Sequence, residues 1–165
     1  MIVIAVIGIL AIVLVPRIGT VKTQAKATGL DTNIRLVQGY AESKIDKWVS
    51  KNTDVAAIAG DIKKAFSGNE NKRIVNPFTS EALNAFAGAA TVPDDDYSLY
   101  IVETAIASPA KDNPGITSGS GANLKGAVLV VIKDDGAEPI EGIWIYAYDE
   151  SGSLLEEKTV EVTTI

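Results

Sequence analysis

The chain has no cysteine and no histidine among its 165 residues. Without cysteine there is neither a disulfide nor a thiolate metal site. No serine lies in a nucleophile elbow, and residues 115–121 are glycine-rich but lack the lysine and the strand-to-helix setting of a phosphate-binding loop. Adjacent carboxylates such as Glu156 and Glu157 would point to opposite faces of a strand. We therefore expect neither an enzyme nor a cofactor or metal site.

The chain also has no excess of positive charge, since 15 Lys and Arg residues stand against 21 Asp and Glu residues and the formal net charge is −6. A nucleic-acid partner is normally recognised through a basic surface, because phosphate neutralisation dominates the affinity. The composition therefore gives no support to nucleic-acid binding.

Hydrophobic residues are concentrated at the start of the chain. Residues 1–15 carry no charge and no side chain that forms hydrogen bonds, and Pro16 and Arg17 end the run. As a helix the run would be ~23 Å long, against ~30 Å for the hydrocarbon core of a bilayer. A secretory signal would need preceding basic residues and a small-residue cleavage site, and a core helix would need a polar face. The run therefore indicates a lipid span or the centre of an assembly.

The run MIVIAVIGILAIVLVP closely resembles the N-terminal segment of mature bacterial type IV pilins. The resemblance covers residues 1–16, with Gly8 and Pro16 at the glycine and proline positions of the family. The leader peptide and the first six mature residues of the family pattern, including its glutamate, are not present in the sequence. We expect that the chain starts inside a longer precursor.

The resemblance implies a structural subunit of a helical filament of identical copies. It also implies a prepilin peptidase and a pilus assembly machinery as partners, an inner-membrane stage before assembly, and a final location at the bacterial cell surface. Arg17, Lys22 and Lys26 would by themselves favour a cytoplasmic domain, so this topology rests on the resemblance. In such filaments the segment between the glycine and the proline is often unwound, so residues 8–15 are expected to be extended or partly melted after assembly. The residues expected to pack in the membrane and the filament core are Met1, Ile4, Ile7, Gly8, Ala11, Leu14 and Pro16.

From Pro16 to about Lys51 the pattern predicts one amphipathic helix, with apolar residues three or four positions apart. The sequence divides into an apolar segment (1–15), an amphipathic helix (16–52) and a head domain (53–165). The positions expected to pack the helix on a sheet are Ile34, Val37, Ala41, Ile45 and Trp48.

Two shorter helices are predicted in the head. Residues 55–66 form an apolar stripe that Asp54 can cap, and residues 80–86 fit a short helix.

The rest of the head reads as strands separated by Gly-, Pro- and Asp-rich turns. In 143–148 the aromatic residues Trp144, Tyr146 and Tyr148 fall on one face. We predict an α+β fold, with the long helix packed on an antiparallel sheet of about four strands, which is also the pilin architecture that the resemblance implies. The predicted strands are 97–104, 126–133, 143–148 and 154–162.

Two other functions fit the same sequence. A pseudopilin of a type II secretion or DNA-uptake system shares the N-terminal segment. A membrane-anchored binding domain would instead hold a ligand in residues 91–96 or 107–123. Loops 107–123 and 134–141 are the predicted variable surface.

Overall fold

The computed structural model describes residues 2–67, 74–80, 85–88, 90, 97–116, 124–136 and 139–164. For residues 11–18 it describes the backbone alone. Residues 91–96 and 117–123, which belong to the loops considered above as ligand sites, lie outside the described part.

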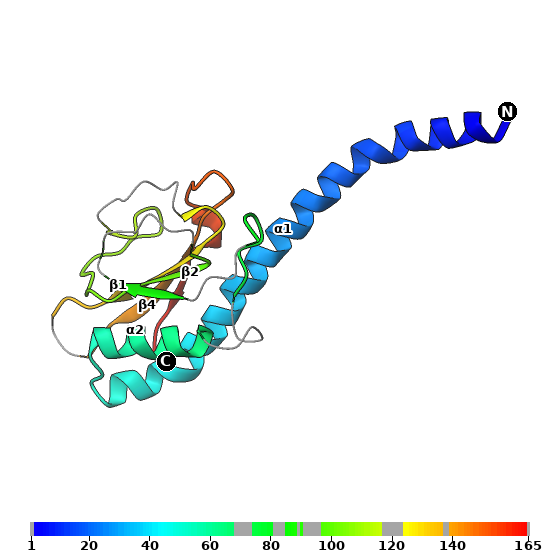
Figure 1. Cartoon of the computed structure of the whole chain (residues 1–165). Coiled ribbons are helices and arrows are strands. Elements are labelled where there is room, and N and C mark those ends of the chain that lie inside the picture. Colours follow the sequence, from blue (N-terminus) through cyan, green and yellow to red (C-terminus); the bar gives the residue numbers. More distant parts are fainter. Residues whose placement is uncertain are drawn as a thin grey trace.

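The first element, α1, is a single helix from Ile2 to Ser50. It passes through Gly8 and Pro16 without a break and curves gently along its length (Figure 1). It ends because Asn52 adopts a left-handed conformation with φ of 54°, while the N–H of Thr53 donates to the carbonyl of Trp48 at 2.9 Å. The expected unwinding of residues 8–15 concerns the assembled filament, so it stays a prediction.

The second helix, α2, spans Val55–Phe66, as predicted. The Asp54 carboxylate accepts a hydrogen bond of 3.1 Å from the backbone N–H of Ala56, which confirms the predicted cap. The buried side chains of α2 are Val55, Ile58, Ala59 and Ile62.

Five strands form one sheet in the order β1-β2-β3-β4-β5. Helix α1 contacts β3, β4 and β5, and α2 contacts β1 and β2, so both helices cover one face of the sheet (Figure 1). The fold is therefore α+β, as predicted. The strands are β1 (Phe86–Gly88), β2 (Leu99–Val102), β3 (Val128–Lys133), β4 (Gly142–Ala147) and β5 (Val160–Val162).

The prediction of a purely antiparallel sheet of about four strands was wrong, because the sheet is mixed and has five strands. β1 runs parallel to β2, and β2 runs parallel to β3, whereas β3, β4 and β5 are antiparallel neighbours. A parallel pair needs a long connection, and residues 103–127 between β2 and β3 are long enough to return the chain to the starting end. Sequence patterns give strand positions but not strand direction across such a loop.

The predicted helix at 80–86 was wrong at its end, where Phe86 begins strand β1. Residues 81–84 lie outside the described part, and Ala85 is not helical. The three residues of β1 are extended because they pair with Tyr100, Ile101 and Val102. No local sequence pattern in this short segment predicts that tertiary contact.

The predicted strand 154–162 is reduced to β5 at its C-terminal end. Leu154 pairs with Tyr148, and Val160 pairs with Ile145. The segment from Leu154 to Val160 is therefore three residues longer than the segment from Ile145 to Tyr148 that it faces. The surplus is taken up in a turn of 3-10 helix, η3, at Glu156–Lys158.

The sheet has a hydrophobic core on each face. Strand β3 shows the division, since Val128 and Val130 pack toward the helices while Leu129 and Val131 pack on the opposite face. Trp144, Tyr146 and Tyr148 share that opposite face, as predicted. The second core was not predicted, although the uninterrupted apolar run of β3 is typical of a strand buried on both faces.

The segment between β2 and β3 covers part of this second core. The Tyr146 hydroxyl donates a hydrogen bond of 2.8 Å to the carbonyl of Ala110, and Ile106 and Ile116 pack against the same cluster.

Candidate assembly surface on the protruding helix

Helix α1 consists of a protruding half and a half embedded in the head. Counting from the N-terminus, Leu30 is the first buried residue among those whose side chains are described. The blue N-terminal half extends well beyond the head in Figure 1. The fold therefore holds α1 by its C-terminal half and presents the rest to its surroundings.

The protruding half begins with an exposed apolar run, residues 2–10. Exposed fractions are 82% for Ile2, 75% for Ile4 and 60% for Ile7, and every residue of the run is exposed. Soluble monomers rarely expose a contiguous apolar surface of this kind, and large ones mark interaction sites. The run is therefore the strongest candidate for a functional surface in the described part of the chain.

The residues predicted for the filament core fall in and beside this run. Ile4, Ile7 and Gly8 are exposed on it. Met1 lies outside the described residues, and only the backbone is described at Ala11, Leu14 and Pro16, where it is helical.

The residues predicted for helix-to-sheet packing all lie in the core between α1 and the sheet. Ile34, Val37, Ala41, Ile45 and Trp48 are at most 5% exposed. Leu30 belongs to the same core and was missed, although it precedes Ile34 by four residues and so continues the same helical stripe.

A polar residue on α1 was also missed. Asn33 is 7% exposed, and its side-chain amide donates a hydrogen bond of 2.9 Å to the carbonyl of Val75. This bond holds residues 74–78 beside α1. No apolar period marks Asn33, so no signal in the sequence pointed to it.

Helices α1 and α2 are joined by an aromatic cluster. The ring of Tyr40 lies edge-on to Trp48 and to Phe66, with centroid distances of 6.1 and 5.6 Å. The indole nitrogen of Trp48 donates to the carboxylate of Asp61 at 3.0 Å. At the other end of the embedded half, the Lys158 ammonium contacts the carboxylate of Asp31. The head therefore contacts α1 at both ends of the embedded half.

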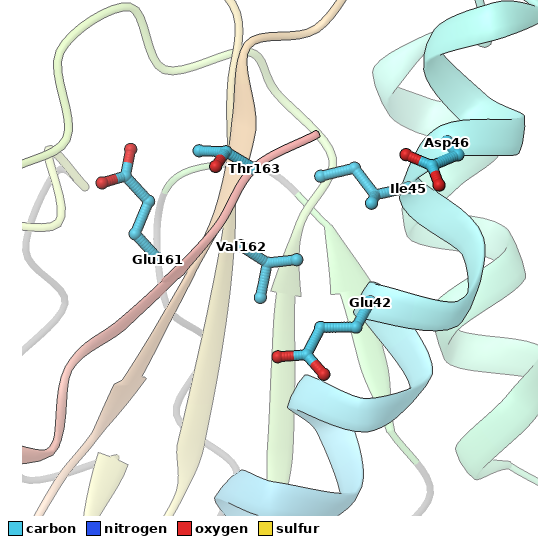
Figure 2. A pocket seen from close by; sticks show the side chains of 6 residues that line it. All are labelled: Glu42, Ile45, Asp46, Glu161, Val162 and Thr163. Carbon is cyan, nitrogen blue, oxygen red and sulfur yellow. The ribbon is translucent and has the colours of Figure 1, made fainter. Parts of the chain in front are cut away.

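Two hollows lie along α1 where the edge strand β5 passes it, and we call them together the flank groove. Its upper hollow, of about 240 Å³, is lined by Asp31, Ile34, Arg35, Gln38, Lys158 and Val160. Its lower hollow, of about 300 Å³, is lined by Glu42, Ile45, Asp46, Glu161, Val162 and Thr163 (Figure 2).

The carboxylates of the lower hollow do not converge on one point. Figure 2 shows Glu161 pointing away from α1, while Glu42 and Asp46 lie on the helix. The described residues include no group of three or more Asp or Glu side chains that could hold a metal ion. The hollow is therefore a poor cation site and a better contact surface.

Buried tyrosines carry most of the perturbed pKa values. On α1, burial raises the pKa of Tyr40, and further raised tyrosine pKa values lie in the second core. Burial raises the pKa of Tyr148 to about 12, and burial also raises the pKa of Tyr146. At the exposed rim of the sheet, a side-chain hydrogen bond from Lys133 to Glu141 raises the pKa of the Lys133 ammonium. These shifts reflect packing and an ion pair, and none of them activates a nucleophile or base.

No helix in the described part of the chain has an apolar stretch long enough to cross a bilayer. The chain matches no protein-family model, no curated protein and no solved structure. Its own residues therefore carry the functional argument.

Proposed function

We propose that this chain is a filament-forming structural subunit, and more narrowly that it is a subunit of a type IV pilus. The exposed apolar run carries the proposal, because a helix that is fixed in a head at one end and apolar on all sides at the other needs partners. The resemblance of residues 1–16 to type IV pilins supports the narrower statement.

The assembly step that we propose exchanges lipid for protein around residues 1–15. Before assembly this segment holds the subunit in the inner membrane, and afterwards it packs among the same segments of neighbouring copies. Both surroundings are apolar, so hydrophobic burial changes little and the packing of the helices decides the balance. The prepilin peptidase, the assembly machinery and the cell-surface location belong to the proposal through the resemblance.

Cryo-electron microscopy of fibres sheared from the native cell surface tests the proposal. We expect density that follows this sequence, with residues 1–15 at the axis and the sheet outside. The same map would show whether residues 8–15 are unwound after assembly. Abundant fibres of another protein would instead favour a pseudopilin, and a chain that stays monomeric in the membrane would overturn the filament proposal in favour of an anchored binding domain.

A further inference from the structure

Helix α1 carries one pair of lysines and one pair of acidic residues, and both pairs have the same spacing. Lys22 and Lys26 lie one turn apart on the protruding half, and Glu42 and Asp46 lie one turn apart on the embedded half. No ion pair involves any of these four side chains within the described residues. The Lys26 ammonium lies over the ring of Phe78, 5.6 Å from the ring centroid.

The protruding half of α1 carries charges of one sign only, whereas the embedded half carries both signs. The sequence has no acidic residue before Asp31, so the protruding half is purely basic. Asp31 itself is already in contact with Lys158. Glu42 and Asp46 are therefore the acidic residues of α1 without an ion pair among the described residues, although Glu42 accepts a hydrogen bond of 2.7 Å from the Gln38 amide.

The spacing of the two pairs is the same. Each lysine precedes one carboxylate by twenty residues, which is ~30 Å along an α-helix. Two parallel copies of α1 displaced by ~30 Å would place Lys22 opposite Glu42 and Lys26 opposite Asp46 at once. A single displacement thus satisfies both pairs.

The two pairs also lie on nearly opposite sides of the helix. Twenty residues at 3.6 per turn rotate the direction of a side chain by about 160°. A copy can therefore offer its lysine side to one neighbour and its acidic side to another. Such a heterologous contact does not close on itself but propagates into a filament.

The acidic pair is exposed to water and also borders an apolar wall. Glu42 and Asp46 line the lower hollow of the flank groove together with Ile45 and Val162 (Figure 2). A neighbouring helix seated there would displace water from the carboxylates. Charge pairs are stronger in such a partly desolvated setting than on a free surface.

We propose that the Lys22–Lys26 side of one copy docks on Glu42 and Asp46 at the flank groove of a second copy, displaced by ~30 Å along the fibre. This contact rests on the proposed filament function and specifies its register.

Charge reversal in the full chain tests the contact. Lys22→Glu with Lys26→Glu, or Glu42→Lys with Asp46→Lys, places like charges opposite each other, so fibre yield should fall at least about tenfold. Combining all four changes restores the pairs and should restore the fibres. The matched control reverses Lys63 and Lys64, an exposed lysine pair on α2 that the proposal does not use, and should assemble normally.

A cross-linking measurement covers the case in which a reversed variant fails to fold. Because the chain has no cysteine, Lys26→Cys and Asp46→Cys in separate copies create one defined pair. Mixed fibres treated with a short bis-maleimide reagent should give a dimer of the two variants, whereas a pairing of Lys26→Cys with Lys64→Cys should not.

Two results would overturn the contact alone: normal fibres from either reversed variant, or fibres without the Lys26–Asp46 dimer. Failure of the unchanged chain to form fibres under any condition would overturn the proposed function, and the contact with it.

Discussion

The carboxylate of Asp61 on α2 accepts a hydrogen bond of 3.0 Å from the indole nitrogen of Trp48 on α1. Trp48 is 1% exposed, so removing this partner leaves a largely buried N–H without its protein acceptor. Asp61→Ala should therefore lower the free energy of unfolding by about 1–2 kcal/mol. Urea unfolding of the full chain in mild detergent measures it. Asp61→Asn keeps an acceptor and should recover most of the loss, and equal losses in both variants would contradict the hydrogen-bond explanation.

The embedded half of α1 should be sensitive to cavities on one side only. Ile45 is 3% exposed, and Ile45→Ala should destabilise the head by about 2–4 kcal/mol. Leu36 is on the same helix but 53% exposed, so Leu36→Ala should change stability by less than about 0.5 kcal/mol. Both values come from the same unfolding experiment. Similar costs at the two positions would contradict the observed orientation of α1.

Gly126 occupies a turn that accepts no side chain. Its φ is +66°, and an added Cβ would lie 2.3 Å from the side-chain oxygen of Asn76, which is fully buried and accepts hydrogen bonds from the N–H groups of Phe78 and Thr79. Gly126→Ala should cost more than about 2 kcal/mol, because it adds this clash to the backbone strain.

Gly136 is the matched control for that substitution. Its φ is +87°, but a Cβ there would meet nothing within 4 Å. Gly136→Ala should therefore show the backbone strain alone, about 1 kcal/mol. Thermal melting of the two variants separates the clash from the strain, and equal shifts would argue against the contact with Asn76.

Stability should fall at high pH because of a buried phenol in the second core. Burial raises the pKa of Tyr148 to about 12 in the fold, whereas an unfolded tyrosine titrates near 10.0. The contribution of the neutral phenol is complete below pH 10 and is lost between pH 10 and 12, by up to about 1.4 kcal/mol per pH unit. Unfolding measured across this window in Tyr148→Phe should show a shallower loss. An unchanged slope would mean that Tyr148 is not the responsible group.

A charge in the exposed apolar run should block assembly without harming the head. Ile4→Lys places an ammonium group in an apolar surrounding, at a cost of about 3 kcal/mol in a lipid span. Fibre yield, counted by electron microscopy, should drop strongly while the near-ultraviolet spectrum of the head stays the same. Val75→Lys is the control, since Val75 is also exposed and apolar but lies on the head. Equal fibre loss in both variants would contradict a special role of the run.

The helical part of the fold was readable from the sequence because its signals are local. The period of Ile34, Val37, Ala41 and Ile45 is that of a helix with one buried side, and Asp54 is a cap residue directly before an apolar stripe. Such signals depend only on neighbours within a few positions. They give the bounds of α2 and the buried side of α1.

The sheet was predicted only in part, because the features that were not predicted depend on contacts between residues far apart in the chain. β1 is three residues long and exists through its pairing with β2. The parallel direction of β2 and β3 depends on how residues 103–127 cross the head. The surplus residues at η3 follow from the register of two pairings, Tyr148 with Leu154 and Ile145 with Val160.

The candidate assembly surface could likewise be predicted only in part from the sequence. The apolar run was evident from composition, whereas its exposure needed the position of the head. The flank groove and the hydrogen bond from Asn33 to Val75 join residues far apart in the chain, so neither had a signal in the sequence.

The continuity of α1 from the apolar run into the core of the head has a mechanical consequence. If the chains assemble as proposed, a pull along the fibre would act on a single helix and on the contacts between neighbouring helices. The strands of the head would lie beside the helices that bear this force and would not bear it directly. The extensibility of such a fibre would then depend on α1 and on the contacts between copies, including the flank groove, more than on the pairing of the central strands.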